Sequence, residues 1–276
     1  MSAIETGIYT YQPLQEVSTE QLVACFNSAF SDYEQSIVFT DESFRYYITA
    51  SAVDLSLSFG AFCNGQLVAF IFNSCDVYNN QKVVFDAGTG VVPEHRGKKV
   101  FSALFEYTCQ QLRDRNITRY YLEVLQSNHH AVSIYRKKGF SVEREYSVLS
   151  ASGAKENLND QVVVLPYREF KPYATRFAVK PSFEHTSYTI GQNPQLYEVR
   201  SLENRAYCVY AKKNGALIQL HYSDLDALRD VINALVHRFP AVFAKNIDCS
   251  CLDVMQVLKE LGFSEILKQY EMVRVI

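Results

Sequence analysis

Residues 91–102, Val-Val-Pro-Glu-His-Arg-Gly-Lys-Lys-Val-Phe-Ser, connect a β-like run to a helix-like run. The preceding run, 82–92, is rich in β-branched residues, and the following run, 100–112, repeats apolar residues at helical spacing. The first turn of a helix leaves backbone N–H groups without helical partners, and the helix dipole places positive charge there. One arginine and two lysines in the turn add to that charge. The stretch therefore predicts a phosphate site at a strand–helix junction.

Composition limits the class of protein. Of its 276 residues, 48% are apolar and 13% aromatic, which is enough to fill a hydrophobic core. The length predicts two domains. A formal net charge of −3 argues against a protein that coats nucleic acid or anionic lipid, because such proteins carry a large excess of Lys and Arg. We therefore expect no nucleic-acid or membrane partner.

Cysteine usage and hydropathy indicate the compartment. The seven cysteines include no C-x-x-C pair, so we expect reduced, mostly buried thiols and no zinc site. No apolar run reaches the length of about eighteen residues that crosses a bilayer, and no apolar signal segment follows Met1. The expected location is the cytoplasm.

Periodicity and turn signals predict the order β-α-α-β-β-β-α-β-α-β for residues 7–149. The elements are strand 7–14, helix 19–30, a helix from residue 40, strands 57–63, 66–75 and 82–92, helix 100–112, strand 118–125, helix 128–138 and strand 141–149. Asn64-Gly65 is the dipeptide that most readily forms a tight hairpin turn. Gly88 and Gly90 predict a bulge or a close backbone approach.

Two motifs lie on these elements. The first is V-x-P-x-x-R-G-x, formed by Val91, Pro93, Arg96 and Gly97. The second is E-V-x-x-x-N-x-x-A-x-x-x-Y-x-x-x-G-F, formed by Glu123, Val124, Asn128, Ala131, Tyr135, Gly139 and Phe140. In element order and in both motifs, residues 7–149 resemble a GCN5-related N-acetyltransferase (GNAT) domain.

The resemblance implies an α/β fold (α+β in some schemes) with a central mixed, mostly antiparallel sheet and helices on both faces. It also implies acetyl-CoA as cosubstrate, with its pyrophosphate on the loop of the first motif, and no metal. The implied coenzyme contacts are Val91, Val92, Arg96, Gly97, Lys98, Lys99, Val100, Phe101, Ser102, Asn128 and Tyr135. The family loop usually carries small residues where this chain has Lys99 and Phe101.

The chemistry of acyl transfer suggests roles for the polar residues. An amine that attacks a thioester forms an oxyanion, which needs hydrogen-bond donors, and a thiolate, which needs a proton. We expect backbone N–H groups around Val91 to meet the oxyanion. A tyrosine stays protonated at neutral pH, since its ordinary pKa is near 10 against about 8.5 for a thiol. The complete second motif favours Tyr135 as this acid over a tyrosine that only packs a helix face.

The base that deprotonates the amine is less determined. Glu123 and Asp86 are both candidates, and a chain of waters could replace either. Glu123 fits a structural hydrogen-bond acceptor equally well. Asp32 and Glu34 either attract a cationic substrate or are solvated loop residues. Asn128 suits a helix N-cap as well as a coenzyme contact.

The chain after residue 149 repeats the earlier pattern. A polar segment, 151–160, and several prolines predict a connection. A strand pair about Asn214-Gly215, helix 224–238, strand 241–247, helix 252–261 and a closing strand follow it. We predict three segments: a catalytic domain, 1–150, a connection, 151–195, and a smaller GNAT-like α/β domain, 196–276.

This second half lacks the motif side chains. When Gly262-Phe263 is aligned with Gly139-Phe140, Cys251 stands where Asn128 does and Leu258 where Tyr135 does. We therefore expect a degenerate GNAT-like half without cofactor chemistry. Its expected role is to cover a sheet edge, to shape the acceptor site or to form a homodimer.

The predicted function is transfer of an acetyl or short acyl group from acetyl-CoA to a primary amine, by direct attack in a ternary complex. The alternative is a non-catalytic module that binds acyl-CoA. A nucleic-acid patch at residues 95–99 fits poorly with the acidic chain. The acceptor stays open among a protein N-terminus, a lysine, an aminoglycoside, a polyamine and an amino acid.

Overall fold

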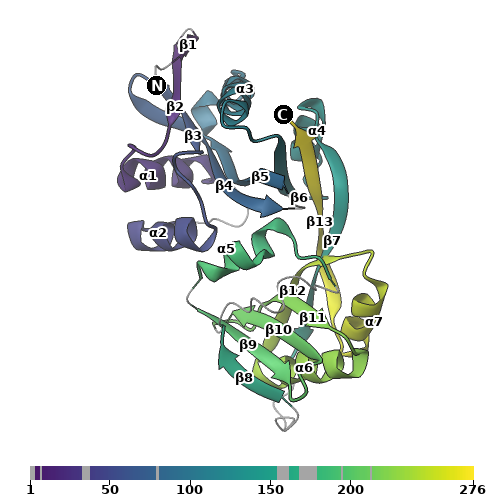
Figure 1. Ribbon diagram of the computed structural model, residues 1–276. Coiled ribbons are helices and arrows are strands. Elements are labelled where there is room, and N and C mark those ends of the chain that lie inside the picture. The colour runs from purple at the N-terminus through teal and green to yellow at the C-terminus, as the bar shows by residue number, and fades with distance from the viewer. Residues whose placement is uncertain are drawn as a thin grey trace. The chain divides into compact units, whose positions relative to one another are not determined.

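The computed structural model describes residues 4–6, 8–32, 38–78, 81–153, 162–167, 179–193, 195–211 and 213–276. The chain forms two compact units (Figure 1). The first contains Met1–Leu122 and Arg274–Ile276, and the second contains Glu123–Val273. None of the helices in these described ranges is long and apolar enough to cross a membrane.

The first unit is a sheet in the order β1-β2-β3-β4-β5-β6, with helices packed on it. Its strands are β1 (Ile4–Thr6), β2 (Tyr9–Pro13), β3 (Phe59–Cys63), β4 (Gln66–Tyr78), β5 (Gln81–Val91) and the start of β6 (Arg119–Leu125). Its helices are α1 (Thr19–Ala29), α2 (Asp41–Ala50), the 3-10 turn η1 (Pro93–His95) and α3 (Val100–Arg113). Neighbouring strands pair antiparallel, except that β5 and β6 are parallel.

Helices cover both faces of this sheet because side chains alternate along β4. On one face, Phe70 stacks on Phe26 of α1 with ring centroids 5.6 Å apart, and Phe72 meets α2. On the other face, Tyr107 of α3 packs against Phe59 of β3. Figure 1 shows α1 and α2 on one side of these strands and α3 on the other.

The second unit is a sheet in the order β13-β7-β12-β11-β10-β9-β8. Its strands are β7 (Ser141–Ser152), β8 (Val162–Pro166), β9 (Leu196–Ser201), β10 (Ala206–Ala211), β11 (Leu217–Tyr222), β12 (Ala241–Asp248) and β13 (Ser264–Val275). Its helices are α4 (His129–Lys137), the 3-10 turn η2 (Phe183–His185), α5 (Ser187–Gly191), α6 (Leu225–Arg238) and α7 (Leu252–Glu260). β11 and β12 are parallel, and the other neighbours are antiparallel.

Here too helices cover both faces. Cys208 and Tyr210 of β10 belong to the core that includes α6, whereas Tyr207 and Val209 point the other way, onto Ile190 of α5. The predicted fold class, a mixed and mostly antiparallel sheet with helices on both faces, is therefore confirmed within each unit.

The two closing strands, β7 and β13, pair in a symmetric register. When the two Gly-Phe dipeptides that precede them are aligned, each pair of facing residues has an equivalent pair. Examples are Ser141–Val273 with Ser264–Ser150, Arg144–Glu271 with Leu267–Val148, and, at the centre, Tyr146–Gln269 with itself. The register shifts also fall at equivalent places. This local two-fold arrangement is what two copies of one folding pattern produce.

The local predictions are largely confirmed. Asn64 and Gly65 both have positive φ, 50° and 79°, and join β3 to β4 in a tight hairpin. The register of β4 and β5 shifts beside Gly88, which is the predicted bulge. A Cβ on Gly90 would lie 2.6 Å from the ring of Phe70, so the backbone approaches closely there.

Other predictions need correction or remain open. The segment 151–160 does not begin as a connection, because Ala151 and Ser152 continue β7 and pair with β12, while 154–160 lie outside the described residues. η2 and α5 were not expected from the sequence, and Glu34 also lies outside the described residues. The division into 1–150, 151–195 and 196–276 stays a prediction, since the compact units divide at Leu122 instead.

Candidate functional site

The predicted phosphate loop forms a tight turn before α3. Gly97 has a φ of 71°, and apart from its chain neighbours no atom of the described residues lies within 4 Å of the place where a Cβ would stand. Lys99, the residue before α3, has a φ of 61° and gives the helix no side-chain cap. Lys98 and Lys99 are exposed, and Val100 is buried. The described chain therefore leaves the N-terminus of α3 without a capping side chain, beside exposed positive charge.

Arg96 ties this turn to neighbouring elements. Its guanidinium pairs with both carboxylate oxygens of Asp32, at 2.5 and 3.0 Å, and donates to the Ala29 carbonyl at 2.7 Å. Its Nε donates to the Val91 carbonyl at 3.0 Å. The Arg96 hydrogen bond lowers the pKa of the Asp32 carboxyl below its ordinary value. Arg96 thus links the end of α1 to the end of β5, and its role as a phosphate ligand stays a prediction.

The end of β5 presents a backbone donor. Val92 donates to the Val68 carbonyl at 3.0 Å, and Val91 lies opposite Ala69 in the adjacent pair. Hydrogen-bonded and non-bonded pairs alternate in an antiparallel ladder, so the Val91 N–H points away from β4. The pairing of β5 with β6 covers only 84–86 of β5, so Val91 lies beyond it. The Val91 N–H is therefore directed away from β4, and its role as the oxyanion donor stays a prediction, whereas the Val92 N–H is engaged with Val68.

Asp86 shapes the β5 bulge. Its carboxylate accepts from the Gly88 N–H at 3.0 Å and from the Thr89 hydroxyl at 2.7 Å. The Tyr47 hydroxyl donates to the Ala87 carbonyl at 2.6 Å on the same bulge. These contacts give Asp86 a structural role, and its role as a base stays a prediction.

The second motif lies on α4. The Asn128 side chain caps the helix by accepting from the Ala131 N–H at 3.0 Å. Tyr135 is half-buried, and its ring meets Phe140 edge to face with centroids 5.6 Å apart. Gly139, with a φ of 85°, ends the helix. The motif's phenylalanine therefore packs on the Tyr135 ring, and its glycine ends the helix that carries Tyr135.

Glu123 lies near the end of β6, in the second unit. One carboxylate oxygen, Oε2, accepts from Nδ2 of Asn246 on β12 at 2.5 Å. Burial, then the nearby Glu184 carboxylate, raises the pKa of Glu123 well above 4.5; Lys245 and the Asn246 hydrogen bond act in the opposite direction, and Glu271 raises it further. A carboxyl with a raised pKa suits a general base that works near neutral pH.

The loop residues fit a bound pyrophosphate. An anion at the N-terminus of α3 would meet backbone N–H groups, the open side of Gly97 and the exposed Lys98 and Lys99. Phe101 packs along α3 on Phe105, with centroids 5.8 Å apart, and Ser102 is half-buried. The Arg96 side chain, by contrast, already makes hydrogen bonds within the protein to Asp32, Ala29 and Val91.

Comparison with known proteins agrees with this geometry. Residues 19–140 match the Acetyltransferase (GNAT) family. Residues 19–140 are a GNAT domain. The matched part of the chain is accordingly of the GNAT acyltransferase type, and acyl-CoA-dependent N-acetyl transfer is the general reaction of this family. No curated protein sequence matches the chain.

Solved GNAT structures share the fold over almost the whole chain. A Pyrococcus horikoshii protein described as an acetyltransferase is 13% identical, with a TM-score of 0.71, covering 99% of this chain and 91% of that one. A GCN5-related N-acetyltransferase from Sphaerobacter thermophilus is 12% identical, with a TM-score of 0.64 and 98% and 96% covered.

A tandem GNAT protein from the clavulanic acid biosynthesis pathway is 11% identical, with a TM-score of 0.65. The match covers 97% of this chain and 98% of the tandem protein. Its tandem organisation agrees with a second, degenerate GNAT-like half at the C-terminus.

The second half also contributes residues that the sequence analysis did not single out. Asn246 and Ser182 lie beside Glu123, and a Glu184–Lys245 ion pair at 2.7 Å lies close by. The signal for Asn246 was present, because the alignment that places Cys251 at Asn128 also places Asn246 at the position of Glu123. Ser182 and Glu184 lie in an irregular segment that had no signal.

Proposed function

We propose that this GNAT chain transfers an acetyl or short acyl group from acyl-CoA to a primary amine by direct attack in a ternary complex. The observation that carries the proposal is the junction of β5 and α3. It combines an outward Val91 N–H with a helix N-terminus that no side chain caps in the described structure. The complete second motif on α4 supports it.

Each residue has a stated role in this proposal. The amine nitrogen attacks the thioester carbonyl carbon, and the Val91 N–H donates to the oxygen that becomes negative. As the C–S bond breaks, the Tyr135 hydroxyl gives its proton to the sulfur, and the second proton that leaves the amine nitrogen restores the hydroxyl. Glu123 takes a proton from the substrate ammonium, with Asp86 as the second candidate base. Gly97, Lys98 and Lys99 would hold the pyrophosphate.

The test is release of coenzyme A thiol across a panel of amines, together with acetyl-CoA binding. The panel contains a peptide N-terminus, a lysine side chain, an aminoglycoside, a polyamine and amino acids. We expect release with at least one class. Binding of acetyl-CoA without release by any class would overturn acyl transfer in favour of a binding module.

Tyr135→Phe separates the two functions further. Loss of the acid predicts a fall in kcat of about 100-fold or more with little change in acetyl-CoA affinity. Tyr188→Phe is the matched control, because Tyr188 is an exposed tyrosine on α5, also in the second unit. Equal kcat in Tyr135→Phe and wild type would remove Tyr135 from the mechanism.

A further inference from the structure

A pair of buried oxygen atoms lies at equivalent positions of the two halves. Asn246 donates to Oε2 of Glu123 at 2.5 Å and to the Ser182 hydroxyl at 3.3 Å. The remaining oxygens, Oε1 of Glu123 and Oδ1 of Asn246, are buried and have no hydrogen-bond partner among the described residues. Asn246 is only 6% exposed. Buried acceptors without donors are costly, so this pair calls for a ligand that donates hydrogen bonds.

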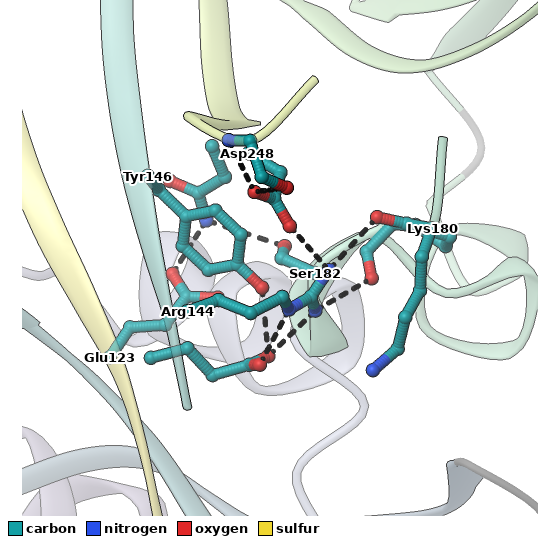
Figure 2. Close-up of polar contacts among 10 residues, drawn as sticks. Glu123, Arg144, Tyr146, Lys180, Ser182 and Asp248 are labelled. Atoms are coloured by element: carbon teal, nitrogen blue, oxygen red, sulfur yellow. Dashed lines mark hydrogen bonds and ion pairs between the residues drawn. The ribbon is translucent and has the colours of Figure 1, made fainter. Parts of the chain in front are cut away.

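The charges around the pair favour a cation. Lys245 is paired with Glu184 at 2.7 Å. Arg144 is paired with Glu271 through two hydrogen bonds, at 2.8 and 2.9 Å. Figure 2 shows Glu123 and Ser182 in the same group of polar contacts as Arg144. Each of these cations is ion-paired with another carboxylate, and Arg144 also meets Asp248 at 3.5 Å. Glu123 has no ion pair among the described residues, so its carboxyl is available to a further cation.

The backbone conformation of Asn246 is typical of residues at functional sites. Its φ is 54°, in the left-handed region, and the register of β12 with β7 shifts between Ala244 and Ile247. Non-glycine residues adopt this conformation at a cost, and such conformations persist at functional sites. The bulge turns the Asn246 amide onto Glu123.

We propose that Glu123 and Asn246 together bind the ammonium group of the acceptor, and that the acceptor is an amine with no carboxylate on the carbon beside it. The inference rests on the proposed acyl transfer and names its acceptor class. An ammonium has three N–H donors and a positive charge, which match two buried acceptor oxygens and a carboxyl without an ion pair among the described residues. An α-carboxylate would bring a second negative charge close to Glu123, Glu184 and Glu271.

The pKa direction agrees with this site. Burial and the neighbouring Glu184 and Glu271 carboxylates raise the pKa of Glu123, against the effect of Lys245. A bound ammonium opposes that shift and favours the ionised carboxylate that then accepts the amine proton.

The test measures equilibrium binding of two probes to the full chain by NMR titration at neutral pH. The probes are 2-phenylethylamine and phenylalanine, which differ only by the α-carboxylate. We expect the amine to bind at least about tenfold tighter than the amino acid. Absence of 2-phenylethylamine binding, or equal affinity for the two probes, would overturn the proposal.

Asn246→Gly is the decisive variant, because glycine adopts a φ of 54° without strain and removes only the amide. We expect it to bind 2-phenylethylamine at least about tenfold more weakly. Asn204→Gly is the matched control, since Asn204 has a φ of 55° in the turn between β9 and β10, and its affinity should match wild type. Unchanged affinity in Asn246→Gly would exclude this residue.

Two further measurements keep the outcomes separate. If Asn246→Gly does not fold, Ser182→Ala tests the same site, because it removes one hydrogen-bond partner of the Asn246 amide. We expect Ser182→Ala to bind 2-phenylethylamine about threefold more weakly. Unchanged affinity would count against the site. Thiol release is measured in parallel. Amine binding without thiol release by any class of the amine panel refutes the acyl-transfer function. Release with Asn246-independent amine binding refutes only the acceptor site.

Discussion

The helices α3 and α6 occupy corresponding places in the two halves and differ at their first turn. Both have 14 residues, and each follows a strand of a parallel pair. The Asp224 carboxylate caps α6 by accepting from the Ala227 N–H at 2.8 Å. No side chain in the described structure caps α3, and Lys99 precedes it. A carboxylate of the protein thus stands where the first half would hold an anionic ligand.

The helices α4 and α7 show the same contrast on identical backbones. Asn128 and Cys251 have φ and ψ of −81°, 67° and −81°, 71°. Each helix ends at a glycine, with φ of 85° at Gly139 and 83° at Gly262. Asn128 caps α4 with its side chain, but Cys251 makes no such bond. The two halves therefore share the residues that determine backbone geometry and differ at Asn128, which is predicted to contact the coenzyme.

The largest expected effect comes from Glu123→Gln, which makes this position neutral, as Asn246 is in the second half. We expect kcat/KM to fall about 100-fold to 10,000-fold, because the base is removed. The free energy of unfolding of this variant, in contrast, should exceed that of wild type. The pKa of Glu123 is raised in the folded chain, so wild-type stability falls as the pH rises from about 4.5 through that raised pKa. Glu123→Gln should not show this pH-dependent loss of stability.

Urea unfolding of wild type and Glu123→Gln at pH 5 and pH 8 measures the second effect. The stability advantage of the variant should grow between the two pH values. Glu143→Gln, on the exposed part of β7, is the control and should show no such growth. An advantage that shrinks with pH would mean that Glu123 is ionised and well stabilised in the free protein.

Asp224→Ala removes the carboxylate that caps α6 and so tests the contrast with α3. We expect the free energy of unfolding to fall by about 1 kcal/mol, because a helix cap is lost. Acetyl-CoA affinity should not change, since no coenzyme contact is expected at α6. Asp226→Ala is the control: Asp226 lies in the same first turn, is exposed and caps nothing, so its loss should be smaller. Weaker coenzyme binding in Asp224→Ala would contradict a cofactor-free second half.

Lys99→Gly sharpens the comparison at α3. Lys99 has a φ of 61°, which costs a side chain about 1–2 kcal/mol, and glycine offsets part of that gain through its greater freedom when unfolded. The net gain in stability should be about 0.5–1 kcal/mol by thermal unfolding. Lys98→Gly, at an exposed neighbour without positive φ, should gain nothing. A less stable Lys99→Gly would show that the lysine side chain holds the turn.

Much of the fold followed from local signals in the sequence. Asn64-Gly65 specifies a tight hairpin by its own backbone preference, and Thr40 with Ser43 forms the reciprocal cap that starts α2. Such features depend on residues close in sequence. The short α5 carries no comparable signal beyond the Thr186 cap, so the sequence predicts irregular structure there instead of a helix.

The site was predictable only in part, for a physical reason. The first motif identified the turn, but the partners of Arg96 come from Asp32 and Ala29, which are distant in sequence. In the same way, Glu123 could be named from its motif, whereas its hydrogen bond to Asn246 depends on tertiary packing. Spacing along the chain cannot show which distant side chain will face a given group.

Cys251→Asn carries the smallest expected effect and tests the comparison most directly. Because Cys251 already has the backbone conformation of Asn128, the new side chain should accept from the Val254 N–H and stabilise the protein by about 0.5 kcal/mol. The reciprocal variant, Asn128→Cys, should lose a similar amount. The two differ in function: Asn128→Cys should also weaken acetyl-CoA binding, while Cys251→Asn should leave it unchanged. The two variants change the N-cap residue of α4 and of α7, so they test which of the two helices meets the coenzyme. Equal effects on coenzyme affinity would mean that the two helices are not functionally distinct.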